Sequence, residues 1–405
     1  MYRLRCLGCG AEYPDDGLLV RCPREHAPAL LRTVYETAGF EPDPSFAGMM
    51  RYRRWLPLRT PAVDRCPRTA VFQSEALCAA LGAPNLWLAF NGYWPERGAH
   101  MPTGTFKDLE SAAVLARFPG NERVLVTASA GNTAAALASA ASASGTRAVI
   151  VIPQNALPKL RFSRPLAACV RIVVVPGDAS YDDAIAFAKS LAQHDPAYAF
   201  EGGATNVARR DGIGTTMLAV VEKLHRTPDY FVQAIGSGAG AIAAHEAALR
   251  LREAGVAAGA VPSLLLVQNA PSAPVYESWK RRSPALIGYD DREDALRARV
   301  RSLAAPVLST QLPPYAVTGG LYDALCESGG DVCVADNRAA REAGEFFARL
   351  EGVTLEPASA VALAGLRAAI AAGELERESC IVLHVTGAGK VPNTVYVPGS
   401  VELAA

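Results

Sequence analysis

A regular alternation of short apolar runs with helical segments is the feature of this sequence that most restricts its fold. Three of the runs have the length and composition of buried strands: 124–127, 148–152 and 171–176. Helical patterns follow these runs at 133–144, 157–169 and 181–193. Neighbouring parallel strands are joined by crossover connections of this kind. The alternation therefore predicts an α/β fold, in which mainly parallel sheets carry helices on their faces.

The alternation covers only the middle of the chain, so we predict two domains. Residues 118–205 would form a small α/β domain, while 31–117 and 206–405 together would form a larger one. Four further strand patterns belong to the larger domain: 86–90, 230–235, 263–267 and 381–385. A chain of 405 residues, of which 50% are hydrophobic, is long enough to bury two such cores.

The charge balance excludes several classes of partner. Lysine and arginine number 40, and aspartate and glutamate also number 40, so the formal net charge is zero. The sequence therefore predicts no nucleic-acid partner and no attraction to an anionic membrane. No apolar run has membrane-spanning length, and residues 1–6 lack the apolar core of a signal peptide. The nine cysteines, most of them in apparent core segments, predict reduced thiols and a cytoplasmic location.

The first 30 residues differ from the rest of the chain and form a separate segment. Cys6, Cys9, Cys22 and His26 have the spacing of a zinc knuckle. Four such ligands around one ion can fold a segment that has too few apolar residues to fold alone. Basic residues are few here and no aromatic residues alternate with them, which argues against a nucleic-acid finger. A structural zinc site and a remnant that no longer binds metal both remain open.

Residues 102–108, with the sequence Pro-Thr-Gly-Thr-Phe-Lys-Asp, place a lysine where a helix is expected to begin. Pro102 and Gly104 favour a sharp turn, Thr105 can cap the helix, and Lys107 then lies in its first turn. The positive field at a helix N-terminus disfavours the protonated amine. A neutral amine is the form that reacts with a carbonyl group. A solvated lysine at a helix start is the alternative interpretation of this segment.

Three later glycine-containing segments share this turn character: 129–133, 236–240 and 385–389. Segment 236–240, Gly-Ser-Gly-Ala-Gly, lies between a strand and a helix, where backbone N–H groups can bind a phosphate. It lacks the lysine and hydroxyl residue of a Walker loop and the acidic residue of a dinucleotide site, so a single phosphate monoester fits best. Segment 129–133 can bind a carboxylate in the same way. An ordinary turn is the alternative for each.

Taken in this order, the four segments resemble those of the fold-type II pyridoxal-phosphate enzymes, in particular the threonine synthase group. The resemblance extends from about residue 56 to 398, and segments 90–96 and 201–212 resemble the cysteate synthases most. It implies a two-domain fold similar to the tryptophan synthase β subunit, with pyridoxal 5'-phosphate as cofactor and a homodimer as assembly. The implied partners are a small amino-acid phosphate ester and a small nucleophile.

The resemblance also implies roles for individual residues. Lys107 carries the cofactor and acts as the catalytic base, and Asn132 contacts the cofactor's ring hydroxyl. Thr386 faces the ring nitrogen with a neutral hydroxyl, which suits elimination and replacement better than transamination. The residues expected to bind the cofactor phosphate are Gly236, Ser237, Gly238, Ala239 and Gly240. The residues expected to bind substrate are Ser129, Gly131 and Thr133, with Arg97, Arg209 and Arg210 as candidate anion-binding cations.

The implied reaction is a β-replacement, in which O-phospho-L-serine and sulfite give L-cysteate and phosphate. Threonine synthesis from O-phosphohomoserine and replacement by another nucleophile are alternatives within the enzyme class. A catalytically inactive binding or regulatory homologue is the alternative outside it, and the presence of Lys107 argues against that. Loop 91–101 is longer than the comparable stretch of threonine synthases, so we expect it to line the active site, with a surface loop as the alternative.

Overall fold

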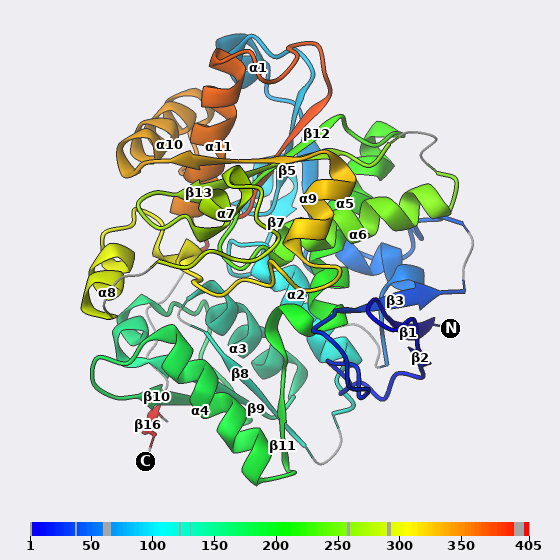
Figure 1. Ribbon diagram of the computed structural model, residues 1–405, viewed down its shortest axis with the longest axis vertical. Coiled ribbons are helices and arrows are strands. Elements are labelled where there is room, and N and C mark those ends of the chain that lie inside the picture. The colour runs from blue at the N-terminus through cyan, green and yellow to red at the C-terminus, as the bar shows by residue number, and fades with distance from the viewer. Residues whose placement is uncertain are drawn as a thin grey trace.

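The computed structural model describes residues 2–36, 39–59, 66–120, 123–129, 131–256, 260–289, 293–392 and 401–404. Ala130 of segment 129–133 and residues 393–398 lie outside the described residues. Figure 1 shows three parts: a larger sheet with its helices at the top, a smaller sheet at the bottom, and a small N-terminal sheet at the right. The predicted α/β architecture with mainly parallel sheets is confirmed.

The alternating middle of the chain forms a five-stranded parallel sheet, with strand order β11-β8-β9-β10-β16. Its strands are β8 (Val124–Ala128), β9 (Ala148–Pro153), β10 (Val170–Val175), β11 (Tyr198–Phe200) and β16 (Val401–Leu403). Helix α3 (Asn132–Ser144) packs on one face and α4 (Tyr181–His194) on the other. Alternate side chains of β9 meet these two helices, since Ile150 and Ile152 cluster with α3 while Val149 and Val151 cluster with α4.

The predicted helix at 157–169 is wrong. The structure has a short 3₁₀ segment, η3 (Gln154–Lys159), followed by irregular chain up to β10. Pro158 lies inside this segment and Pro165 follows it. Each proline removes a backbone N–H and clashes with the preceding helical turn, so a regular helix cannot continue through them.

The larger sheet has six strands in the order β14-β13-β12-β15-β5-β4, all parallel except the edge strand β4. These strands are β4 (Ala70–Phe72), β5 (Leu86–Phe90), β12 (Tyr230–Ala234), β13 (Ser263–Asn269), β14 (Asp331–Ala335) and β15 (Ile381–Val385). One face packs against α1 (Glu75–Leu81), α10 (Asn337–Glu351) and α11 (Pro357–Ala371). The opposite face packs against α5 (Val207–Leu224), α6 (Ala239–Glu253) and α9 (Leu321–Ser328).

Short elements complete the chain. The remaining helical segments are α7 (Pro274–Lys280), α8 (Glu293–Arg301), η1 (Gly48–Trp55), η2 (Pro95–Arg97), η4 (Gly203–Thr205) and η5 (Pro306–Leu308). A two-stranded hairpin pairs β6 (Tyr93–Trp94) with β7 (Ala99–His100). None of the helices in the described part of the chain combines the length and apolar character needed to cross a bilayer.

Both ends of the chain cross the domain boundaries that the sequence predicted. The N-terminal antiparallel sheet contains β1 (Tyr2–Cys6), β2 (Glu12–Tyr13) and β3 (Leu31–Tyr35). Leu31 pairs with Cys6, so the N-terminal segment extends past residue 30. At the other end, β16 pairs with β10 of the smaller sheet instead of joining the larger one. These pairings join residues that are far apart in the sequence. Local sequence patterns do not predict which distant strands pair with each other.

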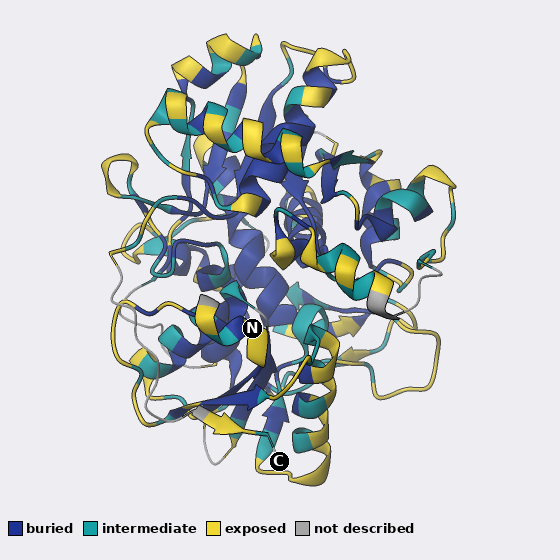
Figure 2. Cartoon of the chain, turned by 90° about the vertical axis from the view of Figure 1, so that its left-hand side faces the viewer, coloured by how far each residue is buried: buried dark blue, intermediate teal, exposed yellow. Residues whose placement is uncertain are grey.

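Helix α2 (Lys107–Arg117) lies in the interior between the two larger sheets. Every residue from Asp108 to Arg117 is buried, and the helix clusters with residues of α3 and of α5. Figure 2 shows the interior helices buried along their whole length, whereas the outer helices are exposed on one side. The sequence of α2 fits this position because most of its residues are small or apolar, while its charged residues need partners.

The C-terminal end of α2 binds the N-terminal segment through a buried ion pair. Arg117 Nη2 lies 2.6 Å from Asp15 Oδ1, and Arg117 Nη1 donates to Asn206 Oδ1 at 3.0 Å. Burial by itself would raise the pKa of Asp15, but the bonds from Arg117 hold that pKa below its ordinary value. Arg117 thus ties the N-terminal segment, α2 and the start of α5 together.

Replacing Arg117 by methionine should destabilise the protein strongly, because it leaves the Asp15 carboxylate buried without its cation. The two side chains are 1% and 2% exposed. We expect the free energy of unfolding in urea to fall by about 3–5 kcal/mol. Arg5, which pairs with Glu12 at 50% exposure, provides the control, since Arg5→Met should cost less than about 1 kcal/mol. Similar losses in the two variants would contradict this role for Arg117.

Candidate active site

The turn that contains the lysine and the turn after β15 lie directly against each other. Phe106 N donates to Thr386 O at 2.9 Å, and Ala388 N donates to Gly104 O at 3.2 Å. Gly104 adopts a φ of +77°, a conformation that side-chain-bearing residues rarely take. Asp108 stabilises the same turn by accepting bonds from Thr103 N at 2.8 Å and Thr103 Oγ1 at 2.9 Å. The structure therefore joins segments 102–108 and 385–389 as one unit.

Lys107 is the first residue of α2, as predicted. Its Nζ lies 2.9 Å from Glu110 Oε2 and 4.6 Å from the centre of the Phe106 ring. Burial lowers the pKa of the Lys107 amine, the Glu110 carboxylate opposes this effect, and the Arg209 charge adds to it. The net direction is below the ordinary pKa of lysine. The sequence predicted a lowered pKa for Lys107 from the field of the helix N-terminus, whereas burial is the largest cause of the lowering.

Segment 129–133 connects β8 to α3, and its polar groups face the start of that helix. Ser129 Oγ accepts bonds from Gly131 N at 3.2 Å and from Ala134 N at 3.1 Å. Thr133 Oγ1 donates to Glu110 Oε1 at 2.8 Å, which brings this loop to the lysine helix. The Asn132 side chain has no hydrogen-bond partner among the described residues. Its amide therefore stays available for a ligand, as expected if it contacts the cofactor.

Segment 236–240 forms the turn between β12 and α6, and it fits a phosphate. Gly238 caps α6 with a φ of +72°, and a Cβ there would lie 2.3 Å from Leu321 Cδ1. A Cβ on Gly240 would lie 2.3 Å from Gln233 Nε2. The first N–H groups of α6 have no carbonyl partner within the helix and point toward the turn. Glycines keep these backbone groups accessible, so the turn fits the phosphate group of pyridoxal phosphate.

Thr386 directly follows β15 in a buried position, and its side chain lies beside another hydroxyl group. Its Oγ1 lies 3.3 Å from Ser359 Oγ, near the start of α11. Ser359 Oγ also donates to Gly387 O at 2.8 Å and accepts from Gly387 N at 3.0 Å. No carboxylate is bonded to Thr386 among the described residues, so the neutral hydroxyl that the prediction requires is present, and its position at the ring nitrogen stays a prediction.

The three predicted arginines lie in different surroundings. Arg209 Nη1 donates to Glu110 Oε1 at 2.7 Å, so its guanidinium lies at the lysine helix. Arg210 has a fully buried side chain that binds Glu246, the carbonyl of Leu31 and the carbonyl of Ala204. The Arg210 guanidinium therefore bonds to partners inside the protein, and its side chain has no exposed surface that could bind a substrate.

The hairpin formed by loop 91–101 contacts the site at its base and not at its tip. Tyr93 N donates to Ala388 O at 2.8 Å, and a Cβ on Gly389 would lie 1.9 Å from Tyr93 O. Arg97, near the tip, lies over the rings of Phe72 and Trp94 at 5.2 and 5.4 Å. It lines a separate cavity of about 320 Å³. The base therefore supports the turn after β15, whereas Arg97 lies away from Lys107.

Sequence analysis did not identify Glu110 as a site residue. Glu110 follows Lys107 by three positions on a helix, so the two side chains share one face. The three-residue spacing of Lys107 and Glu110 could therefore have indicated this contact from the sequence. Ser359 comes close to Thr386 because α11 packs against β15, which is a contact between distant parts of the chain.

The predicted metal ligands Cys6, Cys9, Cys22 and His26 come together in the N-terminal segment. Their ligand atoms all lie within 4.8 Å of one another. Cys6 Sγ lies 3.3 Å from His26 Nε2, and Cys9 Sγ lies 3.7 Å from Cys22 Sγ. Three thiolates and one imidazole at such separations fit a tetrahedral zinc ion. This cluster could hold a structural metal ion.

Comparisons with known proteins show which family the chain resembles over most of its length. The family model "Pyridoxal-phosphate dependent enzyme" matches residues 68–387. The chain is 43% identical over 399 residues to the cysteate synthase of Methanosphaerula palustris, covering 96% of this chain and 90% of that protein. It is 39% identical to the cysteate synthase of Methanocorpusculum labreanum, covering 96% and 93%. Maize serine racemase shares the fold with a TM-score of 0.58 at 20% identity, over 80% of this chain and 88% of that one.

Replacing Gly238 by valine should release the cofactor, because the new side chain would overlap Leu321 and displace the N–H groups from the phosphate. We expect the variant to lose its visible cofactor absorbance on dialysis, while the unmodified protein retains it. Gly145→Val is the matched control, since Gly145 has a φ of +71° but no atom within 4 Å of its Cβ position. Equal cofactor retention in both variants would refute the phosphate assignment.

The Cys6, Cys9, Cys22 and His26 cluster should hold one zinc ion per chain in protein purified without oxygen. Elemental analysis measures this directly. Replacing Cys9 by serine should remove the zinc and increase proteolysis within the first 35 residues, because the segment loses its central ligand set. Protein that contains no zinc and resists proteolysis equally in both forms would show that the cluster is not a metal site.

Proposed function

This chain belongs to the pyridoxal-phosphate-dependent enzyme family and, within it, to the cysteate synthases, and from that premise we propose the reaction that it catalyses. The reaction is a β-replacement in which O-phospho-L-serine and sulfite give L-cysteate and phosphate. The observation that carries this proposal is the convergence on Lys107 of segments far apart in the chain. Thr133 and Arg209 both donate hydrogen bonds to Glu110, which lies beside Lys107. The carbonyl of Thr386 accepts a bond from Phe106, in the turn that contains Lys107.

Bound pyridoxal phosphate supplies an electron sink that makes the α-proton of an amino acid acidic. Lys107 then removes that proton with Nζ, for which its amine must be neutral. Burial favours the neutral amine by lowering the pKa of Lys107. We assign the cofactor phosphate to the turn 236–240 and the ring hydroxyl to Asn132. The neutral hydroxyl of Thr386 would face the ring nitrogen.

The substrate is an anion, and a helix N-terminus provides positive potential where we expect its carboxylate to bind. We assign the substrate carboxylate to Ser129, Gly131 and Thr133, at the N-terminus of α3. The Arg209 guanidinium is bonded to both Glu110 and Glu201, so we propose that it acts on the site through Glu110 and does not bind the substrate phosphate or sulfite directly.

We also propose that the enzyme works in the cytoplasm as a homodimer. All nine cysteines lie in the described part of the chain, and none forms a disulfide. This supports a reducing compartment. The homodimer is an expectation from the resemblance to the threonine synthase group, and analytical ultracentrifugation tests it.

Replacing Lys107 by alanine should abolish the visible absorbance of the bound cofactor and lower turnover on the order of a thousandfold or more. The exposed lysine Lys280 provides the control, and Lys280→Ala should leave both properties unchanged. The assay supplies O-phosphoserine or O-phosphohomoserine, with or without sulfite, and measures phosphate, cysteate and threonine. Threonine formation without sulfite-dependent cysteate would replace the proposed reaction with that of threonine synthase.

A further inference from the structure

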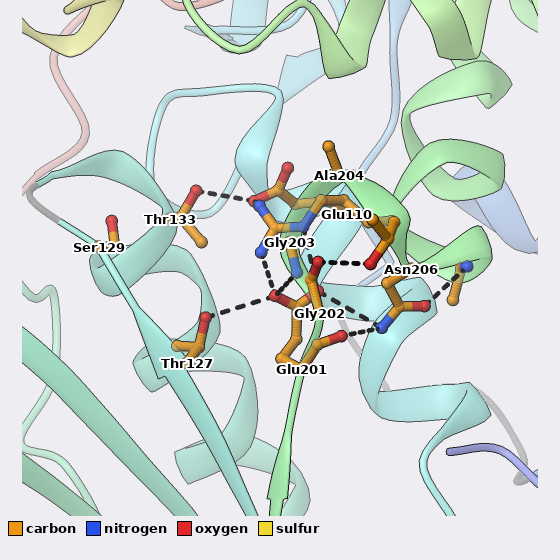
Figure 3. Close-up of polar contacts among 12 residues, drawn as sticks. Glu110, Thr127, Ser129, Thr133, Glu201, Gly202, Gly203, Ala204 and Asn206 are labelled. Carbon is orange, nitrogen blue, oxygen red and sulfur yellow. Dashed lines mark hydrogen bonds and ion pairs between the residues drawn. The ribbon is translucent and has the colours of Figure 1, made fainter. Parts of the chain in front are cut away.

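Glu110, at the centre of a buried cluster of charges, has no part in the reaction as described so far. Glu110 is only 1% exposed, and its two carboxylate oxygens accept bonds from three residues. These are Lys107 Nζ at 2.9 Å, Thr133 Oγ1 at 2.8 Å and Arg209 Nη1 at 2.7 Å. Figure 3 shows Glu110 next to Thr133, with the two side chains joined by a hydrogen bond. Glu110 is therefore the group that holds the catalytic amine.

A second carboxylate fixes Arg209 in this position. Arg209 Nε donates to Glu201 Oε1 at 3.0 Å, and Glu201 is 1% exposed. Glu201 Oε2 also accepts from Gly203 N at 3.0 Å, and Figure 3 shows Glu201 between Thr127 and Asn206. Lys107, Glu110, Arg209 and Glu201 alternate in sign, so a buried cluster with protonated Lys107 has no net charge. A neutral balance of this kind is what burial of four charged groups requires.

Proton transfer completes this balance at Lys107, because the cluster carries one net negative charge while the amine is neutral. When Nζ takes a proton, a positive charge appears in a site that water solvates poorly. A carboxylate at 2.9 Å offsets that charge directly through an ionic hydrogen bond. Burial alone would raise the pKa of Glu110, but Arg209 and Lys107 hold it below its ordinary value. Glu110 thus stays ionised while the lysine changes its protonation.

We propose that Glu110 is a positioning residue for Lys107: it orients the amine and compensates its charge whenever Nζ carries a proton, while Arg209 keeps the carboxylate in place. This inference rests on the proposed function, in which Lys107 takes the α-proton. The proton moves from the α-carbon of the substrate to Nζ, and the C–H electron pair remains on the substrate. Glu110 neither gains nor loses a proton in this step.

Other ionisable groups face the same cluster, so the test must report on Lys107 itself. Asp108, on the same helix, binds the Thr103 turn, and burial raises its pKa to about 7. Tyr181, at the start of α4, has a pKa raised by burial and also interacts with Arg209, Glu201 and Glu110. A pH profile of turnover would combine all of these groups. The pH dependence of Lys107 acylation, followed by mass spectrometry of its peptide, isolates the lysine.

The measurement uses the full-length chain after removal of the cofactor, with acetic anhydride as the probe. Because Glu110 raises the pKa of Lys107, Glu110→Gln should lower that pKa and increase the labelling rate about tenfold at a pH below it. Glu110→Asp keeps the charge and should restore much of the original pKa. Glu246→Gln is the matched control, since Glu246 is equally buried but pairs with Arg210, and it should leave Lys107 unchanged.

Turnover of the cofactor-loaded enzyme gives an independent readout. Glu110→Gln should lower kcat on the order of tenfold or more, with a smaller change in KM, because the lost interaction acts on the protonated state of Lys107. An unchanged Lys107 pKa in Glu110→Gln, or an equal shift in Glu246→Gln, would overturn the inference. An unmodified enzyme that makes no cysteate, yet shows the predicted shift in Lys107 labelling, would refute the proposed reaction and leave the role of Glu110 standing.

Discussion

The burial of helix α2 from Asp108 to Arg117 is the constraint on which the rest of the site depends. This helix carries Lys107, Asp108, Glu110 and Arg117 into the interior, where each charge needs a partner. The partners come from distant parts of the chain: Thr103 from the preceding turn, Arg209 from α5 and Asp15 from the N-terminal segment. Satisfying these groups at once fixes how α2, α5 and the N-terminal segment meet. The active site is a consequence of that packing.

The turn after β15 is the second fixed point. Its backbone is bonded on three sides, by Phe106 from the lysine turn, by Tyr93 from the hairpin and by Glu356 at the start of α11. Strand β15 lies near the centre of the larger sheet, so this turn is anchored to the core. Backbone hydrogen bonds to Thr386 and Ala388 hold the lysine turn in place against this anchored turn. A rigid support of this kind suits a site that must hold a cofactor in one orientation.

Local sequence patterns predicted what depends on local chemistry. The parallel strands, the start of α2 at Lys107 and the glycine turns at 236–240 all follow from period, capping and backbone freedom. The bonding partners of individual side chains were harder to predict, because tertiary packing determines them. Arg209 and Arg210 are neighbours in sequence, yet one reaches the lysine helix while the other binds Glu246. The return of β16 to the smaller sheet likewise required a pairing across more than half of the chain.

Strand β16 also forms the edge of the smaller sheet next to β10. Without β16, strand β10 would offer a row of unpaired N–H and C=O groups to any other extended chain. Three residues, Val401–Leu403, occupy this row in parallel register, and Glu402 pairs with Arg171 at the same edge. A short strand bearing a charged pair is a poor template for further strands. Residues 401–403 therefore cover the β10 edge and disfavour its pairing with the edge of another sheet.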